Sequence, residues 1–280
     1  MSLAAQPLDI ACDDATALQQ QLNALYSYQH DLSTKIYHRS RIVLFQRLMR
    51  QLIAQGYIRN KRAALDIGCN AGFYSKMISD FGFQNVLGVD IVPEYVARAS
   101  AAFHSEIPGK SISFETTDAT LLPLDHSYDF ILCTEVIEHT STPDVVIRSI
   151  MCLLNPGGVA IISLPNALSL GYFTSYFAAR LRGRAVSPEL LDHLKYPFFK
   201  GPALFRQRSG RIIAAASVNV LFNDHMLMWA SRMPFFHRLN RWNFWLSRQW
   251  PFRCLGQFYF FAISKQAQKN AHKNGNDTIR

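Results

Sequence analysis

The segment AALDIGCNAGFYS holds the residues best suited to binding a ligand, because an apolar run leads into two closely spaced glycines. Glycine has no Cβ, so the backbone at Gly68 and Gly72 can turn sharply and approach a ligand. The helix predicted to follow offers free N–H groups to a carboxylate or phosphate. Asp90 ends the next apolar run, 22 residues after Gly68, where a carboxylate can accept hydrogen bonds from ribose hydroxyls. The spacing predicts a nucleotide-type site.

A second polar group, Glu135, Glu138 and His139, follows a later apolar run as ExxEH. Histidine titrates near neutral pH, so His139 is the first candidate for a base that removes a proton from a hydroxyl. Two carboxylates and one histidine could also hold a divalent ion, but the trio is weak evidence for one, and no metal site is predicted. In an alternative interpretation, Glu138 and His139 only anchor the loop.

These residues must be positioned by strands that alternate with helices. Helices are predicted over residues 36–55, 73–82, 93–103 and 143–154, the first with an apolar stripe and arginines on the other face. Strands are predicted over residues 63–68, 85–90, 111–116, 128–134, 158–164, 211–218 and 256–264. The alternation predicts an α/β, Rossmann-like, mostly parallel seven-stranded sheet with helices on both faces and helical additions over the substrate side.

Four motifs in order, LDIGCNAG, GVDIVPEYV, TTDATLLPLDHSYDFILCTEVIEH and LLNPGGVAIISLPN, resemble class I methyltransferases that depend on S-adenosylmethionine (SAM). The resemblance is strongest to the branch that includes ubiquinone-pathway O-methyltransferases and glycan-cluster methyltransferases, and it covers about residues 60–166. It implies an enzyme that uses SAM as methyl donor. An NAD-type oxidoreductase, which would have a third glycine where Phe73 stands, and a non-catalytic SAM-fold binding module are the alternatives.

The resemblance also implies which residues contact SAM: Asp66, Gly68, Asn70, Gly72, Asp90, Ile91, Asp118, Ala119 and Glu135. The loop from 66 to 72 would cradle the amino-acid end, and Asp90 would hold the ribose. Asp118 and the backbone of Ala119 would meet the adenine amino group. Glu135 would lie beside the sulfonium and, with Glu138 and His139, form the catalytic group. Asn70 stands where the family usually has glycine, and asparagine tolerates left-handed backbone geometry.

Charge divides the chain into two parts. Up to Pro165 there are 12 Lys and Arg against 16 Asp and Glu, and from Asn166 onward there are 17 against 4, with all four tryptophans. Residues 235–249 are predicted to be a helix with Trp242 on an apolar face and with Arg238, Arg241 and Arg248 on another, and residues 169–184 repeat this chemistry. Such helices are typical of membrane interfaces. The alternative is that both cover the active site and bury their rings.

The expected organisation is an N-terminal helical cap (1–60), a SAM-binding core (61–166), substrate-side additions with the last two strands (167–265) and a flexible tail (266–280). Five cysteines without a CxxC, and no secretory or membrane-spanning pattern, predict a cytoplasmic protein, with peripheral attachment to the inner membrane face as a further hypothesis. The expected partner is an amphiphilic or anionic acceptor, quinone-like or lipid-linked. A nucleic-acid partner is disfavoured, because no [DNS]PPY-like motif follows CTEVIEH.

Overall fold

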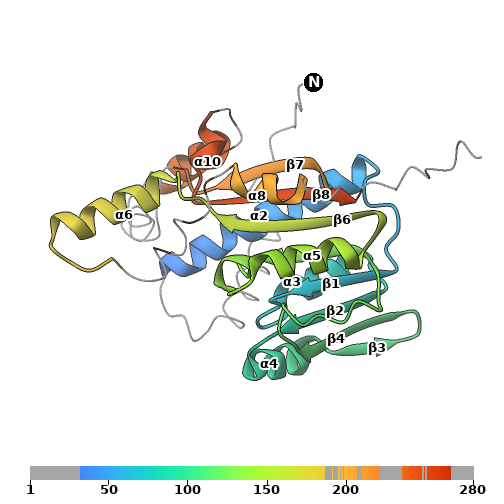
Figure 1. The fold of residues 1–280 in the computed structure, drawn as a ribbon. Coiled ribbons are helices and arrows are strands. Elements are labelled where there is room, and N and C mark those ends of the chain that lie inside the picture. The colour runs from blue at the N-terminus through green and yellow to red at the C-terminus, as the bar shows by residue number, and fades with distance from the viewer. Residues whose placement is uncertain are drawn as a thin grey trace, which may run out of the picture.

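A computed structural model of the chain describes residues 32–265 except 187–190, 192–194, 196, 198, 207–209, 221–234, 248 and 250. The described strands form one eight-stranded sheet in the order β3-β4-β2-β1-β5-β6-β8-β7 (Figure 1). The strands are β1 (Ala63–Ile67), β2 (Asn85–Asp90), β3 (Ser105–Ile107), β4 (Lys110–Thr116), β5 (Tyr128–Thr134), β6 (Leu154–Pro165), β7 (Gly210–Val218) and β8 (Phe258–Lys265). The run β4-β2-β1-β5-β6 is parallel, and β3, β8 and β7 pair antiparallel.

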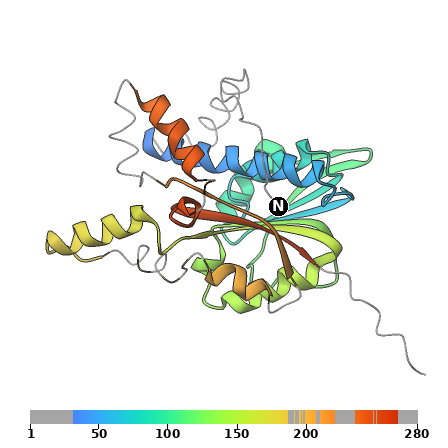
Figure 2. The ribbon, with the colours of Figure 1, turned by 90° about the horizontal axis from the view of Figure 1, so that it is seen from above.

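Helices cover both faces of this sheet. They are α2 (Leu32–Ala54), α3 (Phe73–Asp80), α4 (Pro93–Phe103), α5 (Pro143–Leu153), α6 (Leu170–Leu181), α8 (Lys200–Arg206) and α10 (Phe236–Leu246), with short 3-10 turns η1 (Ile137–His139) and η2 (Phe252–Cys254). Figure 2 shows α2 on one side of the sheet and α5 and α8 on the other. No helix within the described ranges is long and apolar enough to cross a membrane.

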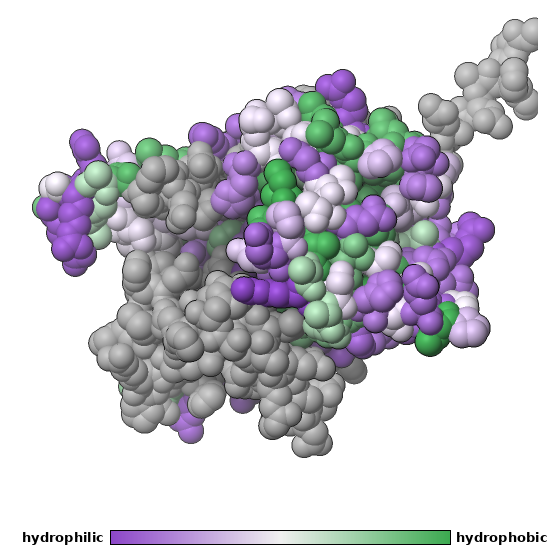
Figure 3. Space-filling model, turned by 90° about the horizontal axis from the view of Figure 1, so that it is seen from below, coloured by the Kyte–Doolittle hydropathy of each residue, from purple (hydrophilic) through white to green (hydrophobic). Residues whose placement is uncertain are grey.

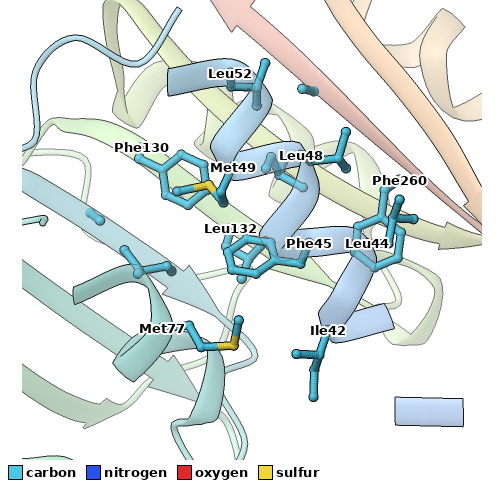
Figure 4. Packing of buried hydrophobic residues seen from close by; sticks show 14 of the residues in the cluster. Ile42, Leu44, Phe45, Leu48, Met49, Leu52, Met77, Phe130, Leu132 and Phe260 are labelled. Carbon is cyan, nitrogen blue, oxygen red and sulfur yellow. The ribbon is translucent and has the colours of Figure 1, made fainter. Parts of the chain in front are cut away.

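Side chains alternate along the buried strands and so create two cores. On β5, Phe130 and Leu132 belong to the core beneath α2, whereas Ile131 and Cys133 belong to the core beneath α5. The first core is closed by one stripe of α2, shown in Figure 4 against Phe130, Leu132 and Phe260. Its fully buried members on α2 are Ile42, Phe45, Met49 and Leu52. Burial of these four side chains fixes the rotation of α2 about its own axis.

The predicted α/β sheet is confirmed, with one more strand than the seven expected. The additional strand β3 has three residues, too few to show an apolar period. It forms because the chain reverses at Gly109, whose φ is 76°, and pairs Ser105 with Ile112 of β4. Both expected additions are helical, as α6 and α10. Residues 1–31, 266–280 and Arg248 lie outside the described residues, and the predicted domain boundaries stay a prediction.

The additions join the sheet at the edge where its parallel strands end. β6 ends at Pro165, which pairs with Phe258, the first residue of β8. Helix α6 follows β6 after four residues, and α10 and η2 precede β8. Asn166 ties this junction together, because its Nδ2 donates to the carbonyl oxygens of Cys254 (2.7 Å) and Gly256 (2.9 Å). Both additions therefore lie at the carboxyl edge of the parallel strands.

Candidate functional site

A cavity of about 580 Å³ lies at this carboxyl edge, beyond the ends of β1, β2 and β5. Ligands of open α/β sheets bind at such edges. Eight of the predicted site residues line the cavity: Gly68, Asn70, Asp90, Ile91, Asp118, Ala119, Glu135 and His139. Segments that are far apart in the sequence thus supply one concave surface.

The glycine loop forms one wall and needs its glycine at residue 68. Gly68 has a φ of 74°, in the left-handed region, and its N–H donates to the carbonyl oxygen of Val89 (2.8 Å). A Cβ on residue 68 would overlap the side chain of Val136, which also lines the cavity. Asn70 has a φ of 47°, so it adopts the left-handed geometry that the sequence allows.

Asp90 connects the end of β2 to this loop. Its Oδ2 accepts a hydrogen bond from the backbone N–H of Asn70 (2.9 Å), and its Oδ1 accepts one from Val92 (3.0 Å). Each carboxylate oxygen can accept a second hydrogen bond. Asp90 can therefore hold the loop in place and still face hydroxyl groups in the cavity.

The far wall of the cavity combines a charged side chain with apolar ones. Asp118 Oδ1 accepts hydrogen bonds from the N–H and the hydroxyl of Thr120, both at 2.8 Å, and these bonds lower the pKa of Asp118. The carboxylate is therefore ionised at neutral pH. Ile91, largely exposed, and the buried Ala119 supply apolar surface beside it. A flat heteroaromatic ring with an exocyclic amino group suits this combination.

The cavity also contains an ion pair that sequence reasoning missed. The guanidinium of Arg41, on α2, pairs with the carboxylate of Glu135. The Arg41 side chain is only 9% exposed, and its guanidinium carbon lies 5.6 Å from the ring centroid of Phe258. Glu135 has a φ of 55°, and its N–H donates to Ser163 Oγ (3.1 Å). The left-handed backbone turns Glu135 out of β5 toward the cavity.

The prediction that arginines lie away from the buried face of this helix is wrong for Arg41. Arg41 precedes Phe45 by four residues, and Leu48 and Leu52 continue at the same helical spacing. Arg41 therefore falls on the buried stripe, where α2 extends past the sheet and its side chain reaches the cavity. That spacing is the signal in the sequence that could have identified it.

Asp66, Gly72 and Glu138 do not line the cavity, and the first two lie beneath or beside the glycine loop. Asp66 is buried beneath the loop, where its Oδ2 accepts from the Ser75 hydroxyl (2.6 Å), and burial raises its pKa to about 7. Gly72 has a φ of 79°, and a Cβ there would press on Phe114 and Ala99, so its glycine serves close packing. Neither residue contacts the cavity directly, although both support the loop.

The ExxEH residues are divided between the cavity and the interior. Glu135 and His139 line the cavity, and His139 is exposed. Glu138 is buried, neither of its carboxyl oxygens has a hydrogen-bond partner, and burial raises its pKa to about 8. Among the described residues, no group of three His, Cys, Asp or Glu side chains is placed to hold a metal ion.

A smaller cavity of about 320 Å³ lies at the opposite edge of the sheet, near Asp129 and Gly157. Both oxygens of Asp129 are engaged there, Oδ2 with the N–H of Arg62 (3.0 Å) and Oδ1 with Asn155 Nδ2 (2.9 Å). This cavity contains none of the predicted site residues.

Comparisons with known proteins agree with this fold. Residues 65–162 match the family model described as a methyltransferase domain. The ubiquinone biosynthesis O-methyltransferase of Burkholderia ambifaria (strain MC40-6) is 29% identical over 145 residues, which cover 51% of this chain and 61% of that protein. The protein of the same name from Xanthomonas euvesicatoria pv. vesicatoria (strain 85-10) is 32% identical over 123 residues, covering 42% and 50%. The chain thus spans about half to three fifths of these relatives.

Solved structures show the same fold. The magnesium protoporphyrin IX methyltransferase of Synechocystis PCC 6803, crystallised with bound SAH, aligns with a TM-score of 0.58 at 15% identity, over 90% of this chain and 100% of that one. The same protein with bound SAM aligns with a TM-score of 0.53. The fold is that of the class I methyltransferases. Within that class, the expected resemblance to ubiquinone-pathway O-methyltransferases is confirmed.

Proposed function

We propose that the chain is a SAM-dependent methyltransferase that methylates an oxygen of an amphiphilic or anionic acceptor. The observation that carries this proposal is the single cavity in which the Gly68 loop, Asp90 and Asp118 face one another. Their order matches the three parts of SAM, with the loop for the amino-acid end, Asp90 for the ribose and Asp118 for the adenine. The methyltransferase-domain match over residues 65–162 supports the same class.

The Arg41–Glu135 ion pair extends this proposal to the amino-acid end of SAM. That end is a zwitterion, with one carboxylate and one ammonium. A guanidinium and a carboxylate side by side can each take the opposite charge, and charge-assisted hydrogen bonds are the stronger ones. The low exposure of Arg41 excludes competing water and makes its charge more effective.

The chemistry requires little from the protein beyond alignment and proton removal. SAM supplies a methyl group already activated on a sulfonium, so the protein mainly orients the acceptor. His139 lines the cavity and is exposed to it, so it can accept the proton of an acceptor hydroxyl. Glu138 lies behind it as a buried and, at neutral pH, protonated carboxyl, which suits a supporting role under the loop.

The acceptor class is inferred from two observations. The sequence relatives named above act in ubiquinone biosynthesis as O-methyltransferases, which favours a hydroxylated, quinone-like ring. The cavity also opens at the sheet edge where α6 and α10 add exposed apolar side chains. A prenylated hydroxyarene combines both requirements, and a lipid-linked glycan is the other acceptor of this kind.

Binding of SAM tests the first step. Calorimetry is expected to show SAM and S-adenosylhomocysteine binding, and Asp90→Ala is expected to weaken both about 10- to 100-fold through the lost ribose and loop hydrogen bonds. Asp125→Ala is the matched control, because Asp125 is an exposed loop carboxylate outside the cavity. Tighter binding of NADH than of SAM would overturn the proposal in favour of an oxidoreductase.

Turnover tests the second step and separates an enzyme from a binding module. The protein is incubated with SAM carrying a labelled methyl group and either a short-chain prenylated catechol or a lipid extract. Label transfer to a hydroxyl of either acceptor supports the proposal. SAM binding without transfer to any extract component would identify a non-catalytic module.

A further inference from the structure

The helix α10 exposes two tryptophans on its outer surface. Arg238, Arg241, Trp242 and Trp245 are all exposed, and their spacing of three and four residues places them on one face of the helix. Trp242 is 61% exposed, and the two indole rings meet edge to face at 5.6 Å. The prediction that arginines and tryptophan occupy different faces is therefore wrong for Arg238 and Arg241, which lie beside Trp242.

The inner side of α10 combines apolar and polar residues, with Leu239 and Leu246 half-buried. Asn243 and Ser247 are almost completely buried, and the backbone carbonyl of Ser247 accepts a hydrogen bond from the Ser217 hydroxyl (3.3 Å). A helix packed on a soluble protein normally keeps its largest apolar side chains inside and exposes polar ones. Exposing two tryptophans to water forgoes the stability that their burial would give unless the outer face meets an apolar phase.

The helix α6 repeats this arrangement at the same edge of the sheet. Its first turn is fixed by Tyr172, which packs on Phe258 with ring centroids 6.1 Å apart. Beyond that turn α6 extends away from the rest of the described chain (Figures 1 and 2). An exposed apolar stripe runs along it, with Phe173 against Phe177 at 4.6 Å and with Leu181 85% exposed. Arg180, Arg182 and Arg184, all exposed, follow at its end.

Past Asp144, the described residues contain no Asp or Glu. Glu189, Asp192 and Asp224 lie outside the described residues. On the projecting segment at the left of Figure 3, hydrophobic and hydrophilic residues lie directly beside one another. Twelve of the sixteen large apolar residues exposed in the described chain come after Asn166. Exposed apolar side chains and arginines thus occur together on α6 and α10.

We propose that the outer faces of α6 and α10 form a docking surface for an anionic lipid membrane. We define this docking surface by two sets of residues. The set on and just after α6 is Phe173, Phe177, Arg180, Leu181, Arg182 and Arg184. The set on α10 is Arg238, Arg241, Trp242 and Trp245. Tryptophan rings settle at the headgroup level, and arginines beside them meet lipid phosphates. The aliphatic Leu181 favours a lipid over a nucleic acid, because bases stack on aromatic rings. Both helices adjoin the edge that carries the cavity.

Co-sedimentation with vesicles tests this surface without any need for turnover. The full chain is expected to pellet with phosphatidylcholine vesicles containing phosphatidylglycerol at low salt. It is expected to remain in solution with phosphatidylcholine alone. Binding should also weaken at about 1 M salt, where the Debye length falls to about 3 Å. A protein that stays in the supernatant with the anionic vesicles at low salt would overturn the proposal.

A triple arginine variant and a matched control test whether the binding depends on the arginines of this surface. Changing Arg180, Arg182 and Arg184 together to Ser is expected to lower partitioning about 100-fold, since one arginine near an anionic surface contributes about fivefold. Changing Arg50, Arg98 and Arg148 to Ser removes the same charge from exposed positions elsewhere and should alter partitioning less than about threefold. Equal losses in the two triple variants would mean that only net charge matters, and the docking surface would be rejected.

The tryptophans are tested separately. Trp242→Ser with Trp245→Ser is expected to reduce binding at low salt and to remove the blue shift of tryptophan fluorescence that vesicles induce. Unchanged SAM affinity in every variant shows a folded protein and keeps this test separate from the proposed function. Two other results would overturn the proposal. One is preferential binding of single-stranded RNA, and the other is a dimer of the wild type that becomes monomeric in the tryptophan variant.

Discussion

Gly68 and Val136 lie in direct contact at the wall of the cavity, so that a Cβ on residue 68 would overlap Val136 Cγ2. One residue follows β1 and the other follows β5, so their contact sets the separation of two loops that face the ligand. Glycine is required here for two independent reasons, which are the space beside Val136 and the φ of 74°.

The two reasons can be separated by substitution. Gly68→Ala is expected to lower the free energy of unfolding by about 3 kcal/mol, from left-handed strain and overlap together. Gly157→Ala is the control, because Gly157 has a φ of 77° and open space around it, and it should cost only about 1 kcal/mol. Adding Val136→Ala to Gly68→Ala should recover the part of the lost free energy of unfolding that comes from the overlap. Equal costs for both glycines in urea unfolding would contradict the contact.

Arg41 is expected to bind the amino-acid end of SAM and not the nucleoside. Arg41→Ala should weaken SAM about 10- to 100-fold, the range for a hydrogen bond to a charged group. Methylthioadenosine lacks the amino acid, and its affinity should change less than about twofold. Arg50→Ala, at an exposed position on the same helix, is the control. Calorimetry with both ligands measures the difference. An equal loss of affinity for SAM and for methylthioadenosine would show that Arg41 does not contact the amino-acid end.

Glu138 is expected to make stability depend on pH. Its pKa in the folded protein is about 8, above the ordinary 4.5, because burial disfavours the charged form. The folded state therefore holds a proton that the unfolded state releases, and the resulting stability is present below pH 4.5 and lost as pH rises through 8. Glu138→Gln should remove a decline on the order of 4 kcal/mol between pH 5 and pH 9.

The measurement is urea unfolding across this pH range, compared with Glu115→Gln, which changes an exposed carboxyl on β4. The control should keep the slope of the wild type. Parallel curves for wild type and Glu138→Gln would show that Glu138 is ionised in the folded protein at neutral pH.

His139 is expected to serve catalysis and not SAM binding. His139→Ala should lower kcat at least about 100-fold, the usual contribution of a general base, while SAM affinity stays within about twofold. His126→Ala, at another exposed position, should leave both unchanged. Methyl transfer to a prenylated catechol, followed at several pH values, gives the readout. Full activity of His139→Ala would remove His139 from the mechanism, and inactivation by EDTA would point to a metal ion instead.

The sheet could be predicted from sequence because its strands are short apolar runs between clear stops. Asp90 and Gly68 were identified for the same reason, since each sits where such a run ends. Strand β3 could not be predicted, because three residues carry no period and the pairing depends on the turn at Gly109.

The site was harder to predict where it depends on the relative placement of elements. Arg41 lies on α2, 24 residues before the start of the matched domain, and only the packing of α2 on the sheet brings it to Glu135. Glu138 and His139 are adjacent in sequence, yet the turn η1 sends one inward and the other to the cavity. Spacing alone does not specify such a turn.

The buried stripe of α2 fixes where the Arg41 side chain lies in the cavity. Each residue advances the helix by about 100° and 1.5 Å. Inserting one residue between Arg41 and Ile42 would leave Ile42, Phe45 and Leu52 in the core and rotate the guanidinium by about 100°, away from Glu135. Such a protein should fold and keep its sheet, but the ion pair between Arg41 and Glu135 would be lost. An insertion at this point therefore leaves the apolar core of α2 in place and alters the cavity.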